Sequence, residues 1–150
     1  MELIKAEAKD LPLIVDMKMR MFKEVGSIAL LRDNAEEMIE QTYAALYREG
    51  KGCHFIVCDG NGQAVACGGA VVKEDVPFCF FKTPRYGYVM DVHCVPEMRR
   101  RGYATRIVEA CMRWLAEQGV HNVKLKPSGA GRAMYEKMGF RDSGEMEAWM

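Results

Sequence analysis

The sequence lacks net charge, because 21 Lys and Arg residues balance 21 Asp and Glu residues. Binding to nucleic acid or to an anionic membrane usually leaves an excess of basic residues, so we expect neither partner. No apolar run approaches the roughly 18–20 residues of a membrane-spanning helix. The first residues also lack the basic flank and apolar stretch of a secretory signal. These absences favour a cytoplasmic protein whose partner is a small molecule or a local protein surface.

Cys-x-x-Cys pairs are missing as well, although the chain contains six cysteines. These six residues, most of which lie inside apolar runs, are Cys53, Cys58, Cys67, Cys79, Cys94 and Cys111. This placement, without a secretory signal, indicates buried free thiols in a reducing compartment rather than a disulfide framework. The adjacent pairs Cys53–His54 and His93–Cys94 do not have the spacing of a structural zinc site. We therefore expect no metal.

The chain has 150 residues, of which 49% are hydrophobic and 28% are charged. This composition is typical of one globular domain with a substantial core, so we predict a single domain over residues 1–150. Periodicity and turn residues predict strands at 3–7, 55–58, 64–72, 88–95, 121–126 and 146–149, and helices at about 12–22, 34–48, 102–118 and 131–138. Elements in this order favour a mixed α/β sheet flanked by helices.

The most informative stretch, Val92 to Thr105, places a strand, a basic loop and a helix start next to one another. A helix N-terminus presents unpaired backbone N–H groups and about half a positive charge, which suits a phosphate. Gly102 and Ala104 let a ligand approach the backbone closely. The three arginines before Gly102 offer bidentate donors to phosphate oxygens. The alternative is a solvated basic turn leading into an ordinary helix.

The run Arg99-Arg100-Arg101-Gly102-Tyr103-Ala104 matches the acyl-CoA-binding motif of the GNAT superfamily of N-acetyltransferases, Gln/Arg-x-x-Gly-x-Gly/Ala. Residues 125–140, which end in the letters MYEKMGF, resemble the second hallmark of that family, at the expected separation. The resemblance implies a central, mostly antiparallel sheet that is flanked by helices and splayed near the CoA-binding strand. It also implies acetyl-CoA as cosubstrate, with no metal.

The resemblance assigns roles to individual residues. Backbone groups of Val92, His93 and Cys94 should meet the pantetheine arm, on a strand that usually carries a bulge, and one N–H should polarise the thioester carbonyl. Ser128 stands where many relatives have an Asn that touches pantetheine or phosphate. The loop and helix start that should hold the pyrophosphate consist of Arg99, Arg100, Arg101, Gly102, Tyr103, Ala104 and Thr105.

Tyr135 occupies the place of the tyrosine that commonly protonates the departing CoA thiolate. A phenol with a pKa of about 10 can donate to a thiolate whose acid has a pKa of about 8.5 only with help from position and surroundings. The resemblance therefore implies that Tyr135 is the catalytic acid. The alternative is a core aromatic residue whose hydroxyl is hydrogen-bonded.

The base that deprotonates the amine is left open by the sequence. Many relatives place a Glu or His on the strand that includes Tyr88 and Met90. Strand alternation predicts that these two residues share one face and that Asp91 and His93 share the other, so no carboxylate falls at the usual place. A bulge could re-aim Asp91 or His93, Glu24 could reach in from the helical region, or water could serve. A structural hydrogen-bonding role is favoured for Asp91, and a packed position for His93.

The acceptor pocket of such proteins lies between the first two helices, the third and fourth strands and the C-terminal strands. The candidate lining residues are Met21, Phe22, Val25, Phe78, Phe80, Phe81, Tyr86 and Tyr88. The apolar run 78–81 is alternatively part of the monomer core or of a homodimer interface. The resemblance implies an N-acetyltransferase that moves the acetyl group of acetyl-CoA to a primary amine of a small molecule or peptide by direct attack in a ternary complex. The alternative is a non-catalytic CoA-binding regulatory protein of the same fold.

Overall fold

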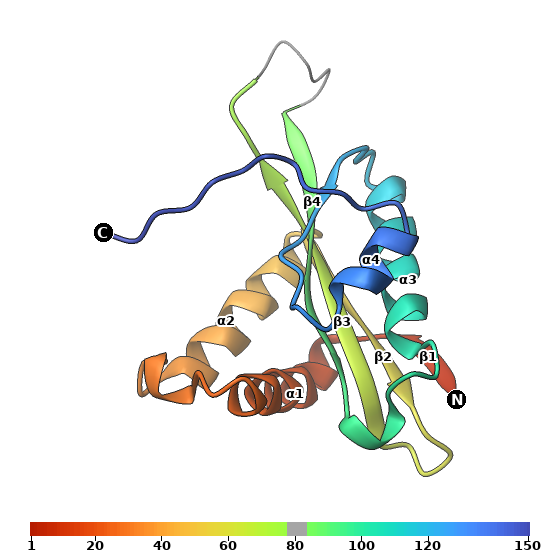
Figure 1. The fold of residues 1–150 in the computed structure, drawn as a ribbon. Coiled ribbons are helices and arrows are strands. Elements are labelled where there is room, and N and C mark those ends of the chain that lie inside the picture. The colour runs from red at the N-terminus through yellow and green to blue at the C-terminus, as the bar shows by residue number, and fades with distance from the viewer. Residues whose placement is uncertain (78–83) are drawn as a thin grey trace.

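The computed structural model describes residues 1–77 and 84–150, and within them the strands form one sheet in the order β1-β2-β3-β4-β5 (Figure 1). The strands are β1 (Glu2–Lys5), β2 (Gly52–Cys58), β3 (Ala64–Glu74), β4 (Arg85–Cys94) and β5 (Val123–Lys124). The helices are α1 (Leu11–Glu24), α2 (Ala35–Arg48), α3 (Tyr103–Glu117) and α4 (Arg132–Lys137). Neighbouring strands are antiparallel except for β4 and β5, which run parallel. The predicted mixed sheet is confirmed.

Helices cover both faces of this sheet, with α1 and α2 on one side and α3 and α4 on the other (Figure 1). Each face has its own buried cluster. Ile14 and Met17 of α1 pack with Ile56 on the first face, and Ile107 and Leu115 of α3 belong to the cluster on the second face. The sheet is therefore buried between two helical layers, and β4 lies where both layers can reach its side chains.

The hairpin between β2 and β3 shows how local sequence sets the fold. One carboxylate oxygen of Asp59 accepts the backbone N–H groups of Asn61 and Gln63, both at 2.9 Å. Gly62 adopts a φ of +77°, a left-handed conformation that glycine reaches without steric cost. The turn between the strands predicted at 55–58 and 64–72 therefore forms through an Asx-type hydrogen-bond pattern.

The parallel strands β4 and β5 pair over a very short length. Gly87 is opposite Val123 and Tyr88 is opposite Lys124, and no further pair follows among the described residues. From Val89 onward, the edge of β4 that faces away from β3 is therefore open to a ligand. The splay expected of the CoA-binding strand is present.

Two predicted strands differ from the structure. The strand expected at 121–126 is reduced to β5, because the chain leaves β4 after Lys124. The strand expected at 146–149 is wrong: the segment has no regular structure, and Met146 and Trp149 are almost fully exposed. Ion pairs from Lys124 and Lys126 hold only its charged side chains. A strand forms only when its backbone groups pair with those of a neighbouring strand, and residues 146–149 are assigned to no strand.

Several sequence expectations fall on residues 78–83, which lie outside the described residues. These are the pocket candidates Phe78, Phe80 and Phe81, and the thiol of Cys79. The five cysteines that the structure describes are unpaired, and Cys53, Cys67 and Cys111 are buried, as predicted for free thiols.

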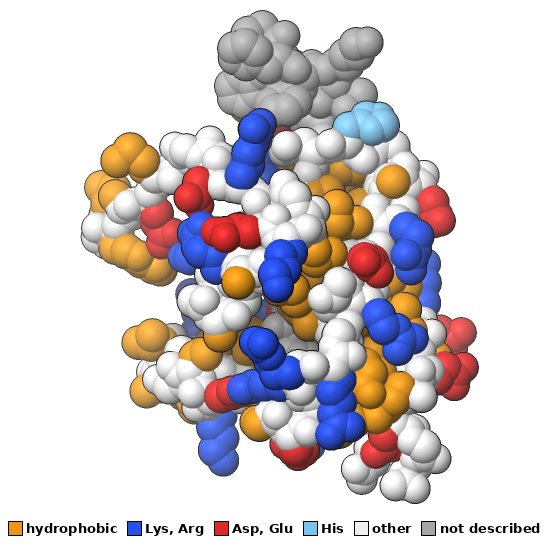
Figure 2. Space-filling view, turned by 45° about the vertical axis from the view of Figure 1, so that its right-hand side comes forward, with side chains coloured by type: hydrophobic (Ala, Val, Ile, Leu, Met, Phe, Trp, Pro, Cys, Tyr) orange, Lys and Arg blue, Asp and Glu red, His pale blue; other side chains and the backbone are white. Residues whose placement is uncertain are grey.

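Charged side chains of both signs are interspersed on the surface that Figure 2 shows, with hydrophobic side chains exposed between them. In the described part of the chain, no helix combines the length and apolar character needed to cross a bilayer.

Gly68 of β3 lies where the sheet and α3 approach closely, and this contact predicts the effect of adding a methyl group. A Cβ atom at Gly68 would lie 2.5 Å from Cγ2 of Ile107, which is fully buried. We expect Gly68→Ala to lower the free energy of unfolding by about 1–3 kcal/mol through overpacking, measured by urea denaturation. Gly60→Ala is the control, because its Cβ meets nothing within 4 Å. Equal stability of the two variants would contradict this packing.

Candidate active site

A bulge interrupts β4 within the stretch that β5 leaves unpaired. Met90 pairs with Gly69 and His93 pairs with Cys67, so Asp91 and Val92 together face the single residue Gly68. Asp91 has a φ of +58°, which places it in the left-handed region that Asp and Asn enter more readily than most residues. The extra residue bends the strand and changes which way the following groups point.

The bulge overturns the alternation predicted for this strand. Met90 packs in the cluster beneath α1 and α2, and the next residue, Asp91, also contacts α1 and α2. Val92 turns to the α3 cluster, and His93 returns to the α1 side. Asp91 and His93 therefore share the face of Met90, which corrects the expectation that they lie opposite it. The possibility left open, that a bulge re-aims both side chains, is what the structure shows.

The backbone N–H groups of β4 reverse their direction at the same place. Before the bulge, the N–H of Gly87 donates toward β5 at 2.8 Å, whereas after the bulge the N–H of Val95 donates to β3 at 2.9 Å. Because these directions alternate along an antiparallel pair, the N–H groups of Val92 and Cys94 point to the open edge. His93, between them, lies in the ladder with β3.

The loop after β4 leads to a helix N-terminus with free donors. Arg100 and Gly102 adopt φ values of +64° and +80°, and the first helical hydrogen bond runs from the N–H of Arg106 to the carbonyl of Gly102. The N–H groups of the first turn, Tyr103 to Thr105, therefore have no acceptor within the helix. A side chain at Gly102 would be strained by the left-handed backbone.

The three arginines before Gly102 are used differently. Arg99 turns back: its Nε donates to the Cys94 carbonyl at 3.0 Å, and its Nη2 lies 2.5 Å from the Glu24 carboxylate. This arginine ties the loop to β4 and to the end of α1. Arg100 and Arg101 are exposed. Their two guanidinium groups are therefore available to bind a phosphate.

His93 and Glu24 form a second cluster at the α1 end of β4. Nδ1 of His93 lies 3.9 Å from the Glu24 carboxylate, and the side chain of His93 is buried while that of Glu24 is 40% exposed. Burial lowers the pKa of His93 below its ordinary value, and the hydrogen bond from Arg99 lowers the pKa of Glu24. At neutral pH this places a neutral imidazole beside a carboxylate anion.

Tyr135 lies on the opposite side of β4. Its ring belongs to the buried cluster that contains Val89 of β4 and Cys111 of α3, and it meets Phe140 edge-on at 5.7 Å between ring centres. Burial, followed by the nearby Cys111 thiol, raises the pKa of Tyr135, so the phenol stays protonated. Among the described residues, we find no hydrogen-bond partner for its hydroxyl.

Ser128 lies in the exposed turn before α4. Its Oγ accepts the backbone N–H of Gly131 at 3.1 Å, which orders the start of the helix that carries Tyr135. Because the oxygen accepts this bond, the hydroxyl hydrogen remains able to donate to a ligand.

Residues 17–140 match the family model for the acetyltransferase (GNAT) family. The chain belongs to the GNAT acetyltransferase family. A predicted acetyltransferase from Clostridium acetobutylicum, solved with acetyl-CoA, shares the fold with a TM-score of 0.88 at 24% identity, over 99% of this chain and 95% of that chain. A GCN5-related N-acetyltransferase from Ralstonia eutropha gives a TM-score of 0.87 at 22% identity, over 99% and 97% of the two chains.

A third GNAT-fold structure is more distant. Glucosamine-6-phosphate N-acetyltransferase from Arabidopsis thaliana gives a TM-score of 0.76 at 15% identity, over 99% of this chain and 97% of that chain. No curated protein matches the chain.

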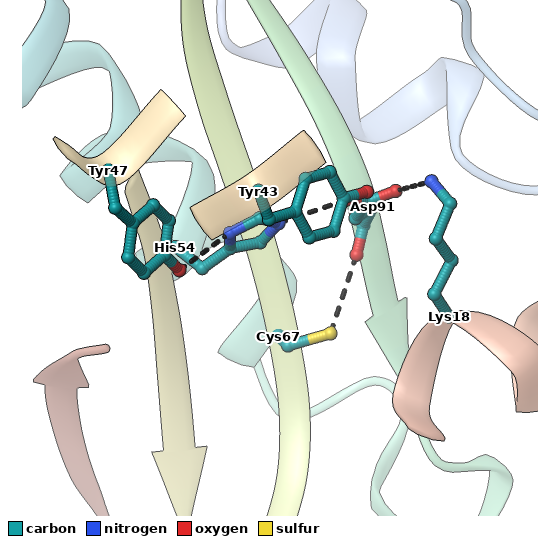
Figure 3. Close-up of polar contacts among 6 residues, drawn as sticks. All are labelled: Lys18, Tyr43, Tyr47, His54, Cys67 and Asp91. Carbon is teal, nitrogen blue, oxygen red and sulfur yellow. Dashed lines mark hydrogen bonds and ion pairs between the residues drawn. The ribbon is translucent and has the colours of Figure 1, made fainter. Parts of the chain in front are cut away.

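This GNAT domain also contains a buried polar network that the sequence analysis missed (Figure 3). The Asp91 carboxylate is hydrogen-bonded by the ammonium of Lys18, by the hydroxyl of Tyr43 and, at 2.9 Å, by Nε2 of His54. Nδ1 of His54 lies 2.9 Å from the hydroxyl of Tyr47. Both contacts of the His54 ring are hydrogen bonds when Nε2 carries the proton and donates to Asp91, and Nδ1 accepts a hydrogen bond from the Tyr47 hydroxyl.

The network keeps Asp91 ionised. Burial alone would raise the pKa of Asp91, but the hydrogen bond from His54 and the charge of Lys18 lower it to about 2. Burial and the Asp91 charge raise the pKa of Tyr43, so its hydroxyl stays a donor. A carboxylate this acidic and fully engaged is a poor proton acceptor, which supports the structural role predicted for Asp91.

Two features of the sequence pointed to this network, but each involved only one or two residues. Tyr43 and Tyr47 are four residues apart on α2, so they lie on the same helix face, and His54 is a polar residue within the apolar run of β2. Lys18 gave no signal, because a lysine on an amphipathic helix is normally solvated.

Other features of the GNAT domain lie away from the splay. A cavity of about 350 Å³ is lined by residues that include Tyr47, Trp114 and Gln118, at the end of α3 opposite Gly102. Across the described ranges, no group of three or more His, Cys, Asp or Glu side chains is arranged to hold a metal ion.

Proposed function

We propose that the protein is an N-acetyltransferase that moves the acetyl group of acetyl-CoA to a primary amine by direct attack in a ternary complex. The observation that carries this proposal is the open edge of β4, set beside the free N–H groups at the start of α3. Family membership makes acetyl transfer the reaction to test on this geometry.

Acetyl-CoA would lie along this edge in one direction. The first turn of α3, with Arg100 and Arg101, offers N–H and guanidinium donors to the pyrophosphate. The pantetheine arm then runs along the open edge of β4 and pairs with its backbone. The thioester carbonyl accepts an N–H from Val92 or Cys94, which stabilises the negative charge that develops on the oxygen during attack.

The acid and the base lie on opposite sides of β4. Tyr135, on the α3 side, holds a protonated phenol for the sulfur. His93, on the α1 side, offers a neutral imidazole 3.9 Å from the Glu24 carboxylate, and this arrangement favours His93 over Asp91 as the base. Glu24 itself is held by Arg99, so its role is to stabilise the imidazolium through its negative charge.

The transfer step balances with these two side chains. The amine nitrogen forms a bond to the carbonyl carbon, the C–S bond breaks, and the electron pair leaves with the sulfur. The proton of the amine passes to His93, and the CoA thiolate takes a proton from Tyr135. Both side chains return to their starting states through solvent.

The proposal is tested by thermal unfolding with acetyl-CoA, followed by release of CoA thiol with a panel of amines. We expect acetyl-CoA to raise the melting temperature, because it binds only the folded protein. The panel contains glucosamine 6-phosphate, an aminoglycoside, a lysine peptide and a peptide with a free N-terminus. Thiol release with any of them supports transfer. A stabilised protein that acetylates none of them points to a CoA-binding regulator.

Tyr135→Phe tests the catalytic acid. Loss of the phenolic proton should lower kcat by roughly 10²–10⁴, because the thiolate must then leave without protonation. Acetyl-CoA affinity, measured by calorimetry, should stay unchanged, because phenylalanine keeps the ring and its packing. Unchanged kcat in this variant would remove Tyr135 from the mechanism.

If His93 is the base, kcat should depend on pH. The pKa of His93 is lowered, so we expect kcat at saturating substrates to stay constant through neutral pH and to fall only at a pH below that at which an ordinary histidine becomes protonated. His93→Gln should lose this acidic limb and have a kcat lower by roughly 10²–10⁴. The same limb in wild type and His93→Gln would assign the titration to another group.

A further inference from the structure

Asp91 receives hydrogen bonds from three separate elements on the α1–α2 face. Lys18 comes from α1, Tyr43 from α2 and His54 from β2, and the Asp91 side chain is only 2% exposed (Figure 3). A buried acid and its partners cost desolvation energy, and apolar residues of similar volume often pack as stably. The arrangement therefore calls for an explanation other than stability.

The neighbouring strand is shaped to let these contacts form. His54 lies opposite Gly69 of β3, and a Cβ atom at Gly69 would come within 2.5 Å of the imidazole ring. The missing side chain allows the ring of His54 to reach across β3 to Asp91. On β3 itself, Sγ of Cys67 donates to the Asp91 carbonyl at 3.5 Å, so both the side chain and the backbone of Asp91 are held.

Residue 91 is also the left-handed residue of the bulge. A non-glycine residue in this conformation is strained and persists only when its surroundings impose it. The three donors act on the same residue whose backbone turns the N–H groups of Val92 and Cys94 to the open edge. Loss of the carboxylate would therefore release the backbone conformation that the thioester carbonyl needs.

We propose that Asp91 is a positioning residue: its carboxylate, held by Lys18, Tyr43 and His54, fixes the bulge so that the following backbone N–H groups polarise the thioester carbonyl. This inference rests on the proposed acetyl transfer. The same contacts attach α1 and α2 to β4, so the helices on the acceptor side are fixed relative to the carbonyl donors. The pyrophosphate site at Gly102 lies outside the network.

The test measures the carbonyl directly. Acetyl-CoA labelled with ¹³C at the carbonyl is bound to wild type, Asp91→Ala and Asp91→Asn, and the carbonyl resonance is compared with that of the free ligand. A carbonyl that accepts hydrogen bonds from wild type should move downfield. We expect Asp91→Ala to lose this shift and to lower kcat by roughly 10–100-fold, while the Kd for CoA stays that of wild type.

The conservative variant separates positioning from folding. Asn tolerates the left-handed region and its amide oxygen still accepts hydrogen bonds, so Asp91→Asn should keep part of the shift and of kcat. Ile56→Val removes a buried methylene from the same face without touching the carboxylate, and its shift and kcat should equal those of wild type. Asp91→Ala that is folded and retains the full shift would overturn the inference.

A milder variant keeps the inference testable where Asp91→Ala does not fold. Tyr43→Phe removes one donor and keeps the ring, so we expect a smaller loss of the downfield shift in the same direction, and an unchanged shift would contradict the inference. Failure of the proposed function is recognised separately. In that case wild type does not bind acetyl-CoA, or binds it without acetylating any amine of the panel, whereas the carbonyl shift needs no acceptor.

Discussion

One left-handed residue in the middle of β4 determines what each face of the site contains. With regular alternation, Asp91 and His93 would point into the α3 cluster, and the N–H groups of Val92 and Cys94 would be used in the ladder with β3. The extra residue at the bulge exchanges these directions. Polar side chains are thereby placed on the α1–α2 face, and backbone donors are placed on the open edge.

The open edge depends in turn on how little of β5 pairs with β4. Two residue pairs hold the strands together, and beyond them α3 and α4 continue to support β4 from one side while α1 supports it from the other. Tyr135 packs in the cluster on the α3 side of β4, and His93 lies on the α1 side. An acetyl group carried along the edge would meet the amine on the α1 side and lose its thiolate where Tyr135 can protonate it.

Patterns within a single element were predictable from the sequence, and contacts between elements were not. The periodicity of Ile107, Cys111 and Leu115 predicted α3, and Gly102 marked its start, because each signal is local. The alternation rule failed at Asp91, because it assumes that no residue is inserted in the strand, whereas β4 carries an extra residue there, and the contacts of that residue come from α1, α2 and β2. The strand expected near Trp149 also depended on pairing between elements: residues 146–149 have no regular structure, and their local pattern could not reveal whether another strand pairs with them.

The central claim is that the main chain of β4 and of the first turn of α3 holds acetyl-CoA. The most direct measurement is a titration of ¹⁵N-labelled protein with acetyl-CoA, followed through the backbone amide resonances. The account predicts large shifts and slowed hydrogen exchange at Val92, Cys94 and Tyr103 to Thr105, with small changes around the cavity near Trp114. Binding that shifts the amides near Trp114 and leaves those of β4 and α3 unchanged would contradict it.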